Sequence, residues 1–228
     1  STGNWLKLVK QKILDIKKRK KIPILVGGTG LYFKALTEGL AKIPNIPNTF
    51  RKKIRVLHEK IGEKKFFSRL KKLDPLAIKR INPSDTQRVI RAYEIKSFTR
   101  KSMYEWFKDT KSDFNQDDFY KIYINFPRDQ LLKRINIRAK TMIKNGAILE
   151  VKKLMKVKIS RSKTAQKAIG IREIKAYLDK NIQKQELIEK ISIKTRQYAK
   201  RQTTWARGNM LEWNKLESDG LNNFLKKI

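Results

Sequence analysis

The residues with the clearest chemistry lie near the C-terminal end of the chain, where one predicted helix gathers its cations on one side. At about 100° per residue, four side chains fall within roughly 60° of one another: Arg196, Lys200, Thr203 and Arg207. The opposite side of this helix holds apolar and aromatic residues: Ile188, Ile191, Tyr198 and Trp205. Guanidinium and ammonium groups in line along a helix form a clamp for phosphate. A polyanion is therefore the first partner that the sequence predicts.

A second candidate site is the turn Gly27-Gly28-Thr29-Gly30, which follows the apolar run Ile22–Val26 and precedes a helical pattern from Leu31 to Leu40. The apolar run is typical of a buried parallel strand, so the pattern predicts a strand, a glycine turn and a helix. Backbone N–H groups in such a turn can approach a phosphate at the positive end of the helix. A tight connection also needs glycine for steric reasons alone, so both interpretations stay open here.

A third candidate lies on a predicted helix from about Asp85 to Ser97, where Gln87, Arg91 and Glu94 share one side. Ser84 and Gln87 fit a capping box, in which Gln87 would only satisfy a backbone donor. Glutamine amides also read adenine edges, and the neighbouring arginines offer forked donors in a chain that otherwise prefers lysine. Both interpretations of Gln87 stay open. The glycine of the segment 168–172 could admit a close backbone, but a helix start in a core would look the same.

Composition supports a polyanionic partner. The 228 residues include 56 Lys plus Arg against 21 Asp plus Glu, a formal net charge of +35. Such an excess attracts phosphate backbones and releases their counterions on binding, so nucleic acid is the predicted partner. A lysine-rich composition on solvated faces would explain part of the excess without any function. With 39% hydrophobic residues, the chain can form one large core or two modest ones.

Several classes of function are excluded by the residues that the sequence lacks. The chain has no cysteine and a single histidine, which excludes disulfides, zinc ribbons, iron–sulfur ligation and a histidine metal site. A bound metal would need oxygen ligands. No apolar run approaches the ~20 residues that span a bilayer, and no signal-peptide pattern opens the chain. We therefore expect a cytoplasmic protein that does not bind membranes.

The order of elements predicts an α/β protein with a helical insertion. Prolines and asparagines at 43–48 mark a boundary, and residues 49–104 are helical and basic, with breaks near Gly62, Asp74-Pro75 and Asn82-Pro83. A strand at 119–126 and helices beginning at 127, 173 and 186 follow. We predict an α/β core formed by 1–47 and 113–228, interrupted by an all-helical domain at 48–112.

Three separate segments together resemble the tRNA dimethylallyltransferase family, also called tRNA isopentenyltransferases. They are Val-Gly-Gly-Thr-Gly-Leu-Tyr at 26–32, Asp-Thr-Gln-Arg-Val-Ile-Arg-Ala-Tyr-Glu at 85–94, and Lys-Arg-Gln-Thr-Thr-Trp-Ala-Arg at 200–207. Their order and spacing match over roughly residues 22–208. The resemblance implies a parallel sheet core of the phosphate-loop NTPase type, with an inserted helical domain that grips the anticodon stem-loop of tRNA.

The activity that this resemblance implies is transfer of a dimethylallyl group from dimethylallyl diphosphate to N6 of the adenosine 3′-adjacent to the anticodon, with release of diphosphate. It further implies Mg²⁺, with ligands outside this sequence, and a monomeric enzyme. A base in a single-stranded loop costs least to flip out of its stack, so a loop adenosine suits this chemistry. The amine is a poor nucleophile unless the departing diphosphate is stabilised by positioned donors and the metal.

The family's functional residues can be carried over to matching positions. Thr29 resembles the threonine whose hydroxyl lies beside the reacting centre. The resemblance assigns substrate or tRNA contacts to Arg51, Gln87, Arg88, Arg91, Lys167, Gly170, Arg172, Lys200, Arg201, Gln202 and Trp205. It assigns diphosphate contacts to Gly28, Arg196 and Arg207. Lys167 stands where the family usually has arginine, which weakens a bidentate contact but keeps the charge.

One departure from the family is clear. The family begins with a Gly-x-x-x-x-Gly-Lys-[Ser/Thr] loop and an Asp that acts as general base, and no such loop occurs in this sequence. We therefore expect a truncated form of the enzyme, in which these 228 residues bind RNA but transfer no prenyl group alone. The alternatives are a non-catalytic basic RNA-binding module and, less favoured by the charge, a small-molecule phosphotransferase.

Overall fold

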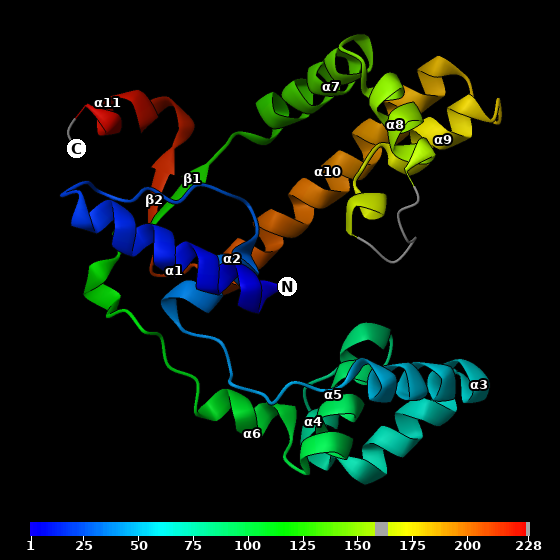
Figure 1. Cartoon of the computed structure of the whole chain (residues 1–228). Helices are drawn as coiled ribbons and strands as arrows, with labels where there is room; N and C mark the ends of the chain where they lie inside the picture. Colours follow the sequence, from blue (N-terminus) through cyan, green and yellow to red (C-terminus); the bar gives the residue numbers. More distant parts are fainter. Residues whose placement is uncertain (158–163, 227–228) are drawn as a thin grey trace. The chain divides into compact units, whose positions relative to one another are not determined.

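The computed structural model of the protein describes residues 1–157 and 164–226. The chain forms two compact units, one of residues 1–27 and 31–119 and the other of residues 28–30 and 120–228. The first unit contains α1 (Thr2–Lys18), most of α2 (Gly30–Thr37), α3 (Asn48–Leu73), α4 (Pro75–Ile78), α5 (Thr86–Thr99), α6 (Met103–Lys108) and the 3₁₀ turn η1 (Gln116–Asp118) (Figure 1). The second contains β1 (Ile122–Asn125), α7 (Arg128–Lys144), α8 (Ala147–Lys156), η2 (Thr164–Lys167), α9 (Ile171–Leu178), α10 (Lys184–Asn209), β2 (Asn214–Glu217), η3 (Ser218–Gly220) and α11 (Leu221–Leu225).

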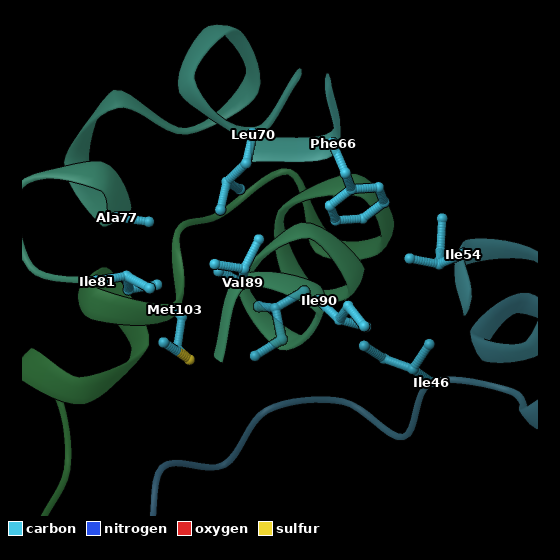
Figure 2. Close-up of a cluster of buried hydrophobic side chains, with 11 residues drawn as sticks. Ile46, Ile54, Phe66, Leu70, Ala77, Ile81, Val89, Ile90 and Met103 are labelled. Atoms are coloured by element: carbon cyan, nitrogen blue, oxygen red, sulfur yellow. The ribbon is translucent and has the colours of Figure 1, made fainter. Parts of the chain in front are cut away.

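Helices α3 to α6 share a hydrophobic core of their own. Phe66 and Leu70 of α3 are fully buried and face Val89 and Ile90 of α5, as Figure 2 shows. The predicted breaks are confirmed: α3 is kinked at Gly62, whose φ of 77° is the left-handed region that glycine tolerates, and it ends before Asp74-Pro75. The cluster and the side chains packed against it run from residue 43 to residue 106. The domain boundaries 48–112 stay a prediction.

The rest of the first unit packs around α1 and α2. The hydroxyl of Ser1 accepts a hydrogen bond from the Asn4 N–H and caps α1, which buries Leu6 and Ile13. The segment at 111–119 supplies hydrogen-bond donors to the C-terminal end of α2. Ser112 Oγ donates to the Leu36 carbonyl (2.6 Å) and Gln116 Nε2 donates to the Thr37 carbonyl (2.7 Å). The last carbonyls of this helix therefore have partners despite lacking the next helical turn.

The predicted strand at Ile22–Val26 is wrong. The segment forms no strand, and the side chains of Ile24 and Val26 are 71% and 90% exposed. An apolar run shows only that its side chains favour burial, whereas a strand also requires backbone N–H and C=O groups of a neighbouring strand. Within residues 1–157 and 164–226, no strand pairs with this segment.

The sheet of the second unit consists of two parallel strands. Ile122 of β1 pairs with Asn214 of β2, and Asn125 pairs with Glu217. β1 lies inside the predicted strand 119–126, but β2 was not predicted, because Asn-Lys-Leu-Glu carries no apolar run. The observed combination of many helices with a small parallel sheet confirms the α/β class with a helical insertion.

Helices α7 to α10 form the core of the second unit. In Figure 1, α7 and α10 run side by side, and Ile143 of α7 packs in one buried cluster with Ile174 of α9 and Leu187 and Ile191 of α10. α10 begins at Lys184 and ends at Asn209, so the predicted helix 186–207 is confirmed with a slightly longer extent. This helix carries the predicted cationic residues, and its first half is fixed by the core.

Candidate functional site

The glycine turn packs directly against the predicted cationic helix. A Cβ atom placed on Gly30 would fall on the indole ring of Trp205, and one placed on Gly28 would fall on the side-chain amide of Gln202. Thr29 lies between these glycines and is exposed. A side chain at Gly30 would displace the rigid indole ring, so glycine is required there, whereas one at Gly28 would meet only the flexible end of Gln202. The structure thus brings Gly28, Thr29, Gln202 and Trp205 together in one unit.

The faces of α10 differ from the predicted division in one respect. Ile191 is buried and Ile188 and Trp205 are half-buried, but Tyr198 is 42% exposed. Tyr198 lies beyond the part of the helix that packs in the core, and the Arg201 guanidinium lies 5.6 Å from its ring centroid. The buried side instead continues through Ala206.

Most cations of α10 remain available to an anion. Lys200, Arg201 and Arg207 are exposed, and Arg196 is half-buried. Within the described part of the chain, none of these side chains forms an ion pair with Asp or Glu. The helix thus carries uncompensated positive charge close to the turn that holds Thr29, which is the electrostatic requirement for binding phosphate or diphosphate.

The predicted segment 167–172 joins η2 to α9. Gly170 has a φ of 104° and donates its N–H to Glu173 Oε2 (2.9 Å), while Lys194 Nζ lies 2.7 Å from Glu173 Oε1. Burial by itself would raise the pKa of Glu173, but the hydrogen bonds from Lys194 and from the backbone N–H groups of Glu173 and Gly170 outweigh it, so the pKa lies below its ordinary value.

Two predicted contact residues of this segment are exposed. Lys167 is the last residue of η2, and Arg172 lies in the first turn of α9. Arg172 lines a shallow cavity of about 330 Å³ together with Lys190, Lys194 and Gln197 of α10. The wall of this cavity combines these cations with the apolar side chains of Ala176, Ile182 and Ile193.

In the first unit, the interpretation of Gln87 as part of a capping box is wrong. Asp85 is the residue that caps α5, because its Oδ1 accepts a hydrogen bond from the Arg88 N–H (3.2 Å). Ser84 instead donates its hydroxyl to Asn82 Oδ1 (2.8 Å). The side chain of Gln87 is exposed, as is that of Arg88, which pairs with Asp85 at 3.3 Å. Gln87 is thus not needed to cap the start of α5 and can contact a ligand.

The remaining predicted residues of this unit, Arg51 and Arg91, meet at a buried carboxylate. Arg51 Nε and Arg91 Nη1 lie 3.3 Å and 3.1 Å from Glu94 Oε2. Arg55 Nε lies 3.9 Å from Glu94 Oε1. Sequence reasoning placed Glu94 on the candidate face with Gln87 and Arg91 but gave it no role, and it missed Arg55. The available signal was the spacing of three between Arg91 and Glu94 and the spacing of four between Arg51 and Arg55, both of which place side chains together on a helix.

Two further properties concern the described residues as a whole. Among residues 1–157 and 164–226, no group of three or more Asp, Glu or His side chains lies close enough to hold a metal ion. The helices in the same ranges are all too short or too polar to cross a membrane.

The profile of the family described as IPP transferase matches residues 1–209 of this chain. The chain belongs to the IPP transferase family. It is 54% identical over 228 residues to the tRNA dimethylallyltransferase of Pelagibacter ubique, covering all of this chain and 73% of that protein. It is 40% identical over 229 residues to the tRNA dimethylallyltransferase of Rickettsia massiliae, again covering all of this chain but 63% of that protein. The chain therefore spans about two thirds of the length of these IPP transferases.

A solved structure described as a eukaryotic dimethylallyltransferase acting on tRNA is also similar, with a TM-score of 0.76 and 26% identity over 95% of this chain and 56% of that one. The resemblance seen in three short segments is thus confirmed at the level of the whole chain. Within this IPP transferase, the roles assigned to individual residues stay predictions. The structure shows that the Thr29 turn and α10 belong to one unit, and that Arg51, Gln87, Arg88 and Arg91 belong to the other.

Proposed function

We propose that this chain contributes the tRNA-binding surface and part of the transfer site of a tRNA dimethylallyltransferase. The reaction joins a dimethylallyl group to N6 of the adenosine 3′-adjacent to the anticodon. The observation that carries the proposal is the close packing of the Gly28-Thr29-Gly30 turn on Gln202 and Trp205 of a cationic helix. Family membership supports the reaction class, and this contact supports the turn as its proposed site.

In this reaction, N6 forms a bond to C1 of the allyl group while the C1–O bond breaks. Diphosphate leaves with the bonding electron pair, and N6 loses a proton. The chain's own residues would orient the reactants. Thr29 is exposed between Gly28 and Gly30, which pack on Gln202 and Trp205, and Arg196 and Arg207 would provide charge for the diphosphate. The described residues offer no Mg²⁺ ligand cluster, so Mg²⁺ stays a family expectation and no step is assigned to it.

The RNA would be bound by exposed donors of both units. Gln87 has no capping role and can reach a base edge, whereas the arginines and lysines suit phosphate oxygens. We propose a monomer that acts in the cytoplasm on the anticodon stem-loop. Dimethylallyl diphosphate is the proposed donor substrate.

The glycine turn gives a matched test of the transfer site. Dimethylallyl transfer to tRNA is measured with the chain joined to the family's phosphate-loop segment, comparing Gly30→Ala with Gly208→Ala. A Cβ at Gly30 meets the Trp205 ring, whereas nothing lies within 4 Å of one at Gly208. We expect Gly30→Ala to lose about tenfold to a hundredfold in transfer, because small misplacements of reacting groups have effects of this size. Equal activity of the two variants would contradict the proposed site.

The second candidate function is a basic RNA-binding module without chemistry, which the net charge of +35 favours. The two functions predict different effects of substitutions at Thr29 and Gln87. Thr29→Ala and Gln87→Ala should abolish or strongly reduce modification in the joined protein if it is a transferase, while a non-catalytic module would show no transfer in any variant. For residues 1–228 alone we expect RNA binding with negligible transfer. Measurable turnover by the purified chain would contradict that expectation.

A further inference from the structure

Glu94 is a buried carboxylate that faces several cations. Its side chain is 1% exposed on α5, a helix whose Val89 and Ile90 belong to the hydrophobic cluster of Figure 2. Arg51 and Arg55 of α3 and Arg91 of α5 all approach it, at 3.3 Å, 3.9 Å and 3.1 Å. Two helices thus direct arginines to one acidic group. With one negative and three positive charges, the cluster keeps a net charge of +2.

The arrangement is not the one that stability alone favours. A buried charge is costly unless its hydrogen bonds are complete, and apolar residues of similar size are often at least as stable in its place. Oε1 of Glu94 has no hydrogen-bond partner among the described residues, and Arg55 is too far from it for a hydrogen bond. Glu94 thus directs Oε2 at Arg51 and Arg91, while Oε1 lies 3.9 Å from Arg55.

The arginines keep donors for a further partner. Arg51 and Arg55 each approach Glu94 through Nε, so the Nη groups of both side chains are not used on this carboxylate. Their side chains are 39% and 49% exposed. A guanidinium presents its donors in a fixed plane, so the Arg51 Nε bond to Glu94 also fixes the direction of the Arg51 Nη donors. Such pre-orientation lowers the conformational entropy that the side chain loses when a ligand binds. Arg55, at 3.9 Å, is held near Glu94 by charge alone.

We propose that Glu94 is a positioning residue that holds Arg51, Arg55 and Arg91 as one binding group for the RNA phosphate backbone, and that Arg55 is an additional RNA-contacting residue. This proposal rests on the proposed function as a tRNA-binding enzyme. Contact with phosphate would balance the excess positive charge that remains after Glu94 has compensated one of the three arginines. The competing explanation is that Glu94 only compensates charge and packs in the core.

The two explanations predict opposite effects when the charge of Glu94 is removed. Glu94→Gln and the control Glu59→Gln, an exposed residue on α3, each raise the net charge by one. Binding of an anticodon stem-loop RNA is measured for both at several salt concentrations, with thermal unfolding as a check on folding. We expect Glu59→Gln to bind as well as the original chain or better. We expect Glu94→Gln to bind the RNA about tenfold more weakly, because losing one oriented hydrogen bond between charged groups has an effect of this size. Equal or tighter binding by Glu94→Gln overturns the proposal.

A second variant keeps the test decisive if Glu94→Gln does not fold. Arg55→Ala should weaken RNA binding and reduce the slope of log affinity against log salt by about one, whereas the exposed Lys53→Ala on the same helix should change the affinity less. If both variants fall equally, Arg55 has no special contact and the proposal fails. Where Glu94→Gln folds, Arg55→Ala should also lose most of its effect in that background, because the two residues act as one unit.

These binding measurements are independent of prenyl transfer. Weaker RNA binding by Glu94→Gln, together with no prenyl transfer by the protein joined to the phosphate-loop segment, would support the positioning role and contradict the transferase. Unchanged binding in a protein that does transfer would overturn the positioning role and leave the transferase intact.

Discussion

Two buried glutamates, one in each unit, meet their cations in different ways. Glu173 receives the N–H of Gly170 on one oxygen and Lys194 on the other, so both oxygens have close partners at the start of α9. Glu94 faces three arginines, yet one oxygen lacks a hydrogen bond and the cluster keeps an excess positive charge. A complete local set of partners is typical of a structural role, while the excess positive charge around Glu94 is what the proposed RNA contact would balance.

The largest expected effect concerns the proposed contact between these cations and RNA phosphates. If the excess charge of the first unit and of α10 binds phosphates, affinity for an anticodon stem-loop RNA should fall about 10³-fold between 50 and 200 mM salt for six or more neutralised phosphates. Filter binding or fluorescence anisotropy at several salt concentrations measures the slope. An affinity that does not change with salt would mean that the cationic residues do not contact the RNA backbone. The difference between Glu94 and Glu173 would then not reflect RNA binding.

The next effect concerns the structural glutamate. Glu173→Ala removes the acceptor of the Gly170 N–H and leaves Lys194 without its partner, so we expect the free energy of unfolding to fall by about 2 kcal/mol. Urea denaturation measures this loss. The control is Glu186→Ala, which removes an exposed pair with Lys190 on α10 and should cost about 0.5 kcal/mol or less. Similar losses in both variants would show that Glu173 is no more structural than a surface residue.

The pH dependence of stability sharpens the same point. Because the pKa of Glu173 is lowered in the folded protein, its contribution is present above the unfolded value of about 4.3 and is lost as pH falls through the folded pKa. The difference in unfolding free energy between the original chain and Glu173→Gln should therefore be constant above about pH 5 and shrink below about pH 4. A difference that grows on acidification would contradict a lowered pKa.

The smallest expected effect separates the two partners of Glu173. Lys194 is half exposed, so solvent screens its charge, and Lys194→Met should lower the free energy of unfolding by only about 0.5–1 kcal/mol. The N–H of Gly170 remains to bind the carboxylate in this variant. A loss as large as that of Glu173→Ala would instead identify Lys194 as the main partner.

Local patterns predicted the helices well. The breaks at Gly62 and Asp74-Pro75, the helix opened after Pro127 and the length of α10 all follow from helical periodicity, proline and glycine, which act over a few residues. The three family segments likewise predicted the family that the whole chain confirms. The contact of Gly28 and Gly30 with Gln202 and Trp205 joins two of those segments, but neither segment by itself predicts it.

Other features were decided by distant contacts. The strand expected at Ile22–Val26 is absent and β2 is present, because pairing joins Asn125 and Glu217, which are 92 residues apart. The cap of α5 is Asp85 and not the pair Ser84 and Gln87, since Ser84 turns to Asn82 instead. Helical spacing placed Glu94 beside Arg91, but did not show that it is buried or that α3 adds two more arginines.

The sequence by itself determined the family, the α/β class, the excess of positive charge and most helix boundaries, because each depends on composition or on hydrogen bonds between residues close in the chain. Tertiary structure alone decided which strands pair, which face of α10 is buried, and which carboxylate collects the arginines. These depend on burial and on backbone partners supplied by segments far away in sequence, which no local pattern encodes.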